Sequence, residues 1–372
     1  MSRRFVNLIV GHYPASTLHR INPWRCFYPT TQQALAAAEN SKGFTVEDAR
    51  LPRAAISFYE PLQEETPDDG EMHYASLGSS SNGIISIRPD GNTFLYDGAS
   101  RSLRVMPAPH SPKYSSVFLT VGDGLYILER NPGTEEDHSF EALLHRAPSD
   151  GICFTDEKWY WRSLPPPPYA YDGYECEKVG DYEEYRRRCY ERNGRDPYVI
   201  RAYTVVRDSQ IWISTRDGGT FSFDTTSGVW SEAGDWALPF YDRVEYAPEL
   251  GLWFGFTSEG RQLAACDLGA ASPTSPPVLR KVWDELAQPL PPRWASLMAF
   301  LLPLGGGKFC VARMFHLAQK GWFRGSIHDY LEEDTFVVLT GVEVVRGSRG
   351  ALRMIKHKSR RYSVGCTTAD LL

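Results

Sequence analysis

Apolar and polar residues alternate along this chain in short runs, and residues 219–230 show the pattern most clearly. Phe221 and Phe223 alternate with polar residues, a Thr-Thr-Ser-Gly cluster interrupts the run after Asp224, and apolar residues then resume. A period of two is typical of a half-buried β-strand, and a polar cluster between two such runs is typical of a hairpin turn. The pattern therefore predicts a pair of antiparallel strands.

The same layout recurs along the sequence. At 93–105 and at 263–283 a strand-like run again ends in Asp before a polar turn. Asp224 and Asp267 are 43 residues apart, the length of four short strands with their turns. Four-stranded units that recur at this period are typical of the β-propeller. We therefore expect an all-β chain that forms one propeller domain over residues 1–372.

Grouped in fours, the predicted strands give five blades and leave two insertions without strand periodicity. The blades cover residues 73–106, 116–164, 202–232, 243–283 and 296–357. The insertions are residues 165–198 and 314–334.

The first 60 residues predict three further strands, at 5–10, 18–28 and 54–59, and a short helix over 32–39. An open sheet edge invites unwanted pairing, so these strands need partners. They find them if the N-terminal strands and the tail 360–364 complete a composite sixth blade that closes the ring. The alternative is that residues 1–60 form a separate cap.

Two resemblances support a propeller. Gly218-Gly219, Phe223-Asp224 and Trp230 together resemble one kelch repeat. The chain also resembles, over nearly its whole length, a grass-expanded plant family of kelch-like proteins with a domain of unknown function. The segments that carry this resemblance are 3–10, 18–22, 27–30, 164–168, 231–239 and 245–255. It implies a propeller fold and a plant source, and it brings no catalytic residues. Leu51-Pro52 precedes a strand pattern rather than an F-box, which argues against a ubiquitin-ligase adaptor.

Charge and cysteine usage restrict the class of partner. The chain has 40 Lys and Arg against 46 Asp and Glu, a net charge of −6, so it lacks the overall positive charge typical of nucleic-acid binding. Its seven cysteines show no paired spacing, which favours a reducing compartment. No apolar run approaches the roughly 18 residues of a membrane span. We expect a soluble protein of the cytoplasm or nucleus, and the acid-free N-terminus leaves import into an organelle as the alternative.

No motif predicts catalysis, a metal or a cofactor. The nine histidines include no i, i+4 pair and no Cys-x₂-Cys partner, so zinc spacing is absent. The Gly-Gly-Gly-Lys at 305–308 precedes a strand and lacks the Ser or Thr of a phosphate-binding loop. We expect no catalytic residue, no metal ligand and no cofactor. Residues that converge from separate blades, including a copper-radical set of Tyr, Cys and His, stay open as an alternative.

The two insertions supply the candidate partner-binding residues. Tyr and Arg frequently anchor protein interfaces, because they offer a large contact area and directional hydrogen bonds. The candidates are Tyr169, Tyr171, Tyr174, Tyr185, Arg186 and Arg187 in the first insertion and Trp322 and Phe323 in the second. The alternatives are a solvated charged helix in the first case and packing over the ring in the second. The basic window 356–361 predicts either a charged edge strand or a patch for nuclear import or RNA.

The sequence thus favours a non-catalytic interaction platform for a protein partner. An enzyme that uses a central pocket and a binder of small ligands or glycans are the alternatives, because a fold by itself does not choose a ligand.

Overall fold

The structure of the chain is a computed structural model that describes residues 3–12, 15–40, 45–59, 72–78, 82–88, 90–133, 135–146, 158–171, 198–284, 286, 291, 293–317, 335–347, 350–365 and 368–372. The chain divides into two compact units. The first unit comprises Met1–Leu62, Arg243–Asp267 and Val278–Leu372, and the second comprises Gln63–Asp242 and Leu268–Pro277.

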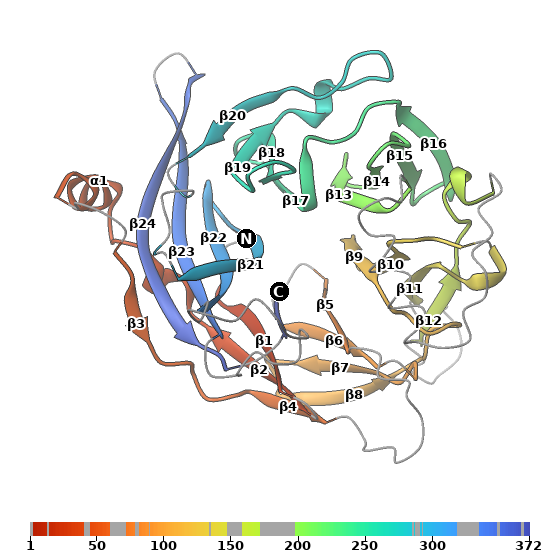
Figure 1. Cartoon of the computed structure of the whole chain (residues 1–372). Coiled ribbons are helices and arrows are strands. Elements are labelled where there is room, and N and C mark those ends of the chain that lie inside the picture. Colours follow the sequence, from red (N-terminus) through yellow and green to blue (C-terminus); the bar gives the residue numbers. More distant parts are fainter. Residues whose placement is uncertain are drawn as a thin grey trace, which may run out of the picture. The chain divides into compact units, whose positions relative to one another are not determined.

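The second unit is built from antiparallel four-stranded meanders whose strands are hydrogen-bonded in chain order (Figure 1). One contains β5 (His73–Leu77), β6 (Gly83–Ile87), β7 (Thr93–Asp97) and β8 (Ser102–Met106). The next contains β9 (Ser116–Val121), β10 (Gly124–Glu129), β11 (Phe140–Arg146) and β12 (Lys158–Ser163). A third contains β13 (Ile200–Val206), β14 (Gln210–Thr215), β15 (Thr220–Asp224) and β16 (Val229–Gly234). The 3-10 helices are η2 (Glu135–Asp137), η3 (Pro168–Tyr171) and η4 (Leu268–Ala270).

The first unit repeats this organisation and adds a helix. It holds most of the meander β17 (Phe240–Ala247), β18 (Leu252–Thr257), β19 (Leu263–Cys266) and β20 (Leu279–Trp283). A longer meander contains β21 (Trp294–Gly305), β22 (Lys308–Leu317), β23 (Thr335–Arg346) and β24 (Leu352–Ser363), with β3 (Glu47–Ala49) paired parallel to β24. Another sheet has the order β25 (Thr368–Leu371), β1 (Val6–His12), β2 (Ala15–Ile21) and β4 (Ile56–Tyr59). The helices are η1 (Pro23–Cys26) and α1 (Thr31–Asn40).

The predicted fold class is confirmed. The chain is all-β and is built from successive antiparallel meanders of four strands, the sheet organisation of a β-propeller, although β13–β16 and β17–β20 share one eight-stranded sheet in which β13 is next to β17. Strands β7, β11 and β18 coincide with the predicted runs, and α1 covers the predicted helix at 32–39. The prediction that strands from both ends of the chain share one sheet is confirmed by the pairing of β25 with β1.

The prediction of which C-terminal residues join that sheet was wrong. Residues 360–364 do not join the N-terminal strands, because 360–363 continue β24 and pair with β23. The strand that joins them is β25, whose register places Leu371 opposite Leu8. Ala369 and Leu371 are buried in the core of the first unit, so alternate positions of this short strand gain apolar burial.

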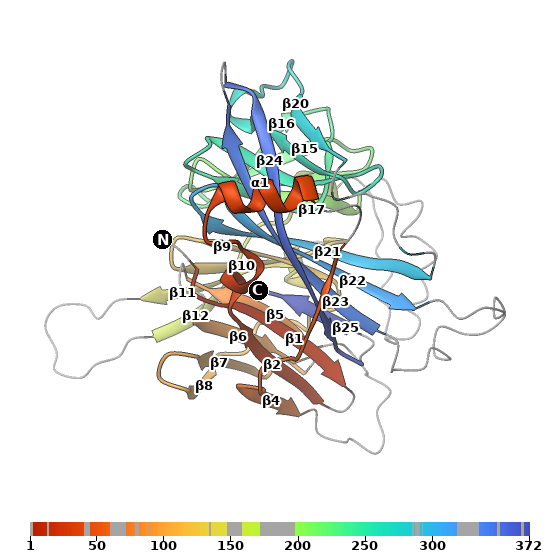
Figure 2. The ribbon, with the colours of Figure 1, turned by 90° about the vertical axis from the view of Figure 1, so that its left-hand side faces the viewer.

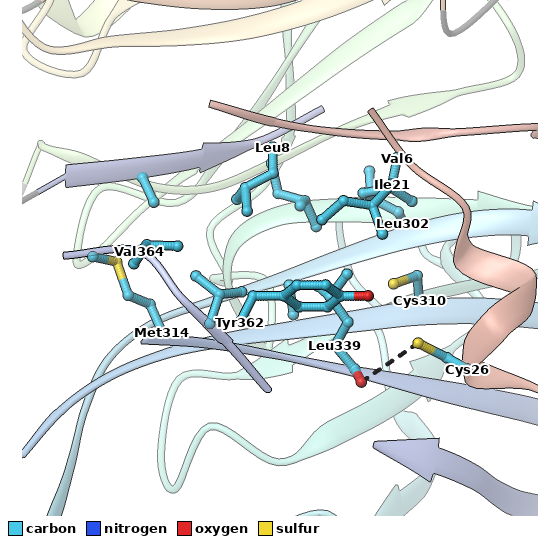
Figure 3. Close-up of a cluster of buried hydrophobic side chains, with 14 of the residues drawn as sticks. Val6, Leu8, Ile21, Cys26, Leu302, Cys310, Met314, Leu339, Tyr362 and Val364 are labelled. Carbon is cyan, nitrogen blue, oxygen red and sulfur yellow. Dashed lines mark hydrogen bonds between the residues drawn. The ribbon is translucent and has the colours of Figure 1, made fainter. Parts of the chain in front are cut away.

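The main core of the first unit lies between the sheet that contains β1 and the long meander β21–β24 (Figure 3). Val6 and Leu8 of β1 pack with Leu302, Leu339 and other buried side chains of the meander. The thiol of Cys26 donates a hydrogen bond to the carbonyl of Leu339, with the sulfur 3.6 Å from the oxygen. Burial of each such apolar side chain stabilises the fold by about 1.5–3 kcal/mol.

Trp230, which the kelch resemblance places at the end of a blade, joins two meanders of the second unit. Its ring lies 5.6 Å from that of Phe140 and 5.1 Å from that of Phe223. Phe140 and Phe223 also meet edge to face at 4.8 Å. The indole N–H donates to the carbonyl of Pro165 at 2.7 Å, so the polar end of the ring is satisfied.

Candidate functional site

Tyr169 is the one predicted site residue whose side chain the structure describes. Tyr169 lies in η3, is 5% exposed, and stacks on Tyr198 with the ring centroids 5.4 Å apart. It also contacts Phe221 at 5.1 Å and so packs in the core of the second unit. The backbone of Tyr171 ends η3. The other predicted residues lie outside the described residues: Tyr174, Tyr185, Arg186, Arg187, Trp322 and Phe323.

A surface groove of about 340 Å³ lies between α1 and β24. Figure 2 shows α1 crossing the upper part of β24. We call this site the α1–β24 groove. It is lined by Ala34, Leu35, Ala37 and Ala38 of α1, by residues 353–359 of β24, and by Tyr28, Thr45, Val46 and Glu47.

One wall of the α1–β24 groove is a sheet edge. The inner edge of β24 pairs with β23 along most of its length. On the outer edge, β3 pairs only with Arg360–Tyr362, and no other strand in the described part of the chain joins it. The outer edge of residues 353–359 therefore presents main-chain donors and acceptors to the groove, which is the arrangement that accepts an added strand.

Helix α1 forms the other wall of the α1–β24 groove. Thr30 caps the helix, because its hydroxyl accepts a hydrogen bond from the amide of Gln33 at 3.2 Å. Ala34 is fully buried beneath the helix. Ala37 and Ala38 give the wall only methyl groups, so a peptide backbone can come close to the helix.

A buried polar network beneath α1 holds the helix against the sheet. The carboxylate of Glu343 accepts hydrogen bonds from the Thr31 hydroxyl at 2.9 Å and from the Lys308 ammonium at 2.8 Å. Burial raises the pKa of Glu343, but the hydrogen bonds from Lys308 and Thr31 outweigh it, and the pKa is lowered. A carboxylate at this place also suits the positive end of the helix dipole.

His357 completes the network in its neutral form. The amide of Tyr28 donates to Nδ1 at 3.2 Å, so the ring proton lies on Nε2, which faces Glu343 Oε2 at 3.2 Å. Burial lowers the pKa of His357 and outweighs the opposing effect of Glu343. Protonation would place a second hydrogen at Nδ1, where the Tyr28 amide now donates.

Acid is therefore expected to weaken the attachment of α1. Because the pKa of His357 is below its ordinary value of 6.5, its contribution is present above pH 6.5 and is lost as the pH falls below that value. The free energy of unfolding of the native protein should decrease between pH 7 and pH 5 more steeply than that of His357→Gln. Urea denaturation at both pH values measures the difference, and parallel decreases in the two proteins would contradict it.

Cations line the β24 side of the groove. Arg353, Lys356 and Lys358 all contribute to it. The Lys358 ammonium lies 4.8 Å from the centre of the Tyr28 ring, within reach of a cation–π interaction. Burial, with a smaller effect of Arg313, lowers the pKa of Lys356. Among the described lining residues the only carboxylate is that of Glu47, which faces Arg360 at 3.8 Å.

A second polar cluster lies in the second unit around Glu141, at the start of β11. The side chains of Glu141 and Lys113 are both fully buried and form an ion pair with 2.6 Å between Nζ and Oε2. The other carboxylate oxygen accepts from the amide of His110 at 3.1 Å and faces its ring at 2.5 Å. The His110 ring stacks on His138, which bonds to Ser163.

The polar groups of this cluster bond mainly to one another and to neighbouring parts of the chain. The Lys113 ammonium also donates to the hydroxyl and carbonyl of Ser111 and to the carbonyl of His138, at distances of 2.9–3.1 Å. A carboxylate and an ammonium bonded in this way stabilise two loops against β11. No group of three His, Cys, Asp or Glu residues that could hold a metal occurs in the described parts of either unit.

Fold and site together define a β-propeller-type protein with a cationic groove at a sheet edge. A family model described as a protein of unknown function (DUF1668) matches residues 3–362, and the chain belongs to this family. No curated protein matches the chain.

The solved structures that match include the β-propeller domain of Myceliophteria thermophila Cps50 (Swd1). That match has 13% identity and a TM-score of 0.31, and covers 78% of this chain and 88% of the other. The N-terminal domain of Nup159 matches with 8% identity and a TM-score of 0.25, over 94% of this chain and 57% of the other.

Helices in the described residues include none with the length and apolarity to cross a membrane.

Proposed function

We propose that this chain is a non-catalytic platform for protein interaction, built as a single kelch-like propeller domain of six blades. The sheet of β25, β1, β2 and β4 supports this because it joins both ends of the chain, as a closing blade would. The observation that carries the function is the outer edge of β24, which faces the α1–β24 groove. The buried Glu141–Lys113 pair supports a structural rather than catalytic use of its charges.

The cytoplasm or nucleus is the proposed location. Cys26, Cys266 and Cys310 are buried free thiols. Burial raises the pKa of Cys26 to about 12, so this thiol stays protonated and unreactive at neutral pH. Such cysteines suit a reducing compartment.

The first insertion is proposed as a second contact region, with Tyr174, Tyr185, Arg186 and Arg187 as its anchors and Trp322 and Phe323 as counterparts in the other insertion. Support comes from the stacked rings of Tyr169 and Tyr198, which stand before and after residues 172–197. Both rings are packed against the core of the second unit, so the described residues on the two sides of 172–197 are held next to each other.

Affinity purification with mass spectrometry tests the platform. We expect the full-length chain to recover specific protein partners, and a variant in which a short Gly-Ser linker replaces residues 172–195 to lose some of them. Arg186→Glu with Arg187→Glu should reproduce that loss without altering the unfolding midpoint. Failure of the full-length chain to recover any specific partner would contradict the platform, and unchanged partners in both variants would contradict the role of the insertion.

A further inference from the structure

We propose that the α1–β24 groove binds an extended acidic segment of a partner protein, which adds as a strand to the outer edge of β24. This inference rests on the proposed platform function and names the partner's chemistry. Three independent features of the groove support it: the strand edge, the small residues of α1, and the cations of β24.

The strand edge sets the form and length of the ligand. Residues 353–359 of β24 line the groove, and β3 already pairs with the next positions, Arg360–Tyr362. The protein therefore uses this same edge for a parallel strand of its own. At about 3.3 Å per residue, the edge beside the groove accommodates an extended segment of about six residues. Strand addition of this kind takes its affinity from main-chain hydrogen bonds.

The opposite wall sets the side chains that fit. Ala37 and Ala38 leave room for a backbone and for short side chains, whereas Leu35 offers an apolar contact. The volume of about 340 Å³ is at the lower end of the range for ligand pockets. A nucleic-acid duplex is far too wide for such a groove, and an extended peptide is not.

Charge selects an acidic ligand. The whole chain carries a net charge of −6, yet the groove is lined by Arg353, Lys356 and Lys358 against the single acid Glu47. Glu47 faces Arg360 and Asp48 faces Arg361, so each of these two acids already lies beside a cation of β24. Carboxylates of an added strand would meet Arg353 and Lys358, which gives both orientation and a faster encounter.

The test uses the full-length protein and fluorescence anisotropy. The probe is a labelled peptide of about eight residues that alternates Glu and Thr, long enough to span the edge. We expect saturable binding that weakens with added salt, because exposed charges are screened. A Lys-and-Thr peptide should not bind. The acidic peptide with Pro in place of every Thr should bind at least tenfold more weakly, because every second residue then lacks a main-chain N–H and the chain favours the polyproline II conformation over a strand.

Variants locate the site. Arg353→Glu with Lys358→Glu should weaken binding at least tenfold and leave Lys356, which is partly buried, in place. The matched control is Arg104→Glu with Lys281→Glu, two exposed cations on the outer strands β8 and β20, which should bind like the native protein. Urea denaturation should show that both double variants are folded.

Three results would overturn the inference: equal binding by the Arg353/Lys358 variant and the native protein, equal binding of the Pro-containing peptide, or tighter binding of an oligothymidylate than of the acidic peptide. The platform itself fails in a different way. If cellular partners are still recovered by the Arg353/Lys358 variant, the platform stands and only this groove is excluded as its site.

Discussion

Replacing Glu141 by Ala is expected to lower the free energy of unfolding of the second unit by about 3–5 kcal/mol, because Lys113 keeps its charge without a counter-charge. The side chains of both residues are fully buried. Removal of one partner of a buried pair costs the desolvation of the charge that remains, and three neutral acceptors around Lys113 offset only part of it. Urea denaturation followed by tryptophan fluorescence measures the change.

A charge-free double variant separates the ion pair from the space it fills. Lys113→Met with Glu141→Leu removes both charges and keeps most of the volume, so it should recover more than half of the loss. The surface control is Asp48→Ala, which breaks the exposed 2.7 Å contact with Arg361 and should cost at most about 1 kcal/mol. A double variant no more stable than Glu141→Ala would show that packing, and not charge, sets the stability of this region.

The pH dependence of stability gives an independent test of the Glu141–Lys113 ion pair. Burial raises the pKa of Glu141, but the charge and hydrogen bond of Lys113 and the bonds from His110 outweigh it, and the pKa is lowered from its ordinary value of 4.5. Its contribution is therefore present above pH 4.5 and is lost as the pH falls further. Below this value the native protein should lose stability more steeply than the charge-free double variant.

Most of the sheet structure could be predicted because its signals are local. Period-two alternation between turn residues fixes β7, β11 and β18 at their observed ends. The pairing of β25 with β1 depends on chemistry at opposite ends of the chain, and a four-residue strand carries too little periodicity to reveal it. Strand β24 was predicted to end too early, because the basic window 356–361 resembles a solvated edge. In the structure the strand continues to Ser363, and Ser359 and Tyr362 are buried.

The α1–β24 groove could not be predicted either, because it too depends on residues far apart in the chain. The helix and the basic window were each predicted, but nothing local indicates that residues 34–38 and 353–359 line one surface. Two buried acids were also missed. Glu141 and Glu343 each lie within an otherwise apolar strand, and a single carboxylate in such a run was the signal that could have found them. Tyr169 was predicted as a partner contact on composition alone, which carries no information on burial.

Replacing Gly341 by Ala is expected to destabilise the first unit by about 2–3 kcal/mol, the upper part of the usual cost of overpacking. Gly341 lies in β23, where a Cβ would overlap the carbonyl oxygen of Cys26 and come within 3.0 Å of the Phe27 ring. The obstacle is backbone, which cannot rotate away as a side chain can. Either η1 moves off β23 or the strand shifts, and both weaken the core around Cys26.

Gly347→Ala is the matched control, because the position is exposed and, among the described residues, a Cβ there would meet just the Ala351 oxygen, at an ordinary contact distance of 3.5 Å. Its stability should stay within about 0.5 kcal/mol of the native protein. The displacement of η1 should also reach the groove, since Phe27 packs on His357 at 4.8 Å. We therefore expect Gly341→Ala to reduce the pH dependence assigned to His357 as well. Equal stability of the two alanine variants would mean that η1 yields at little cost, and α1 would then owe its position mainly to the bonds of Glu343.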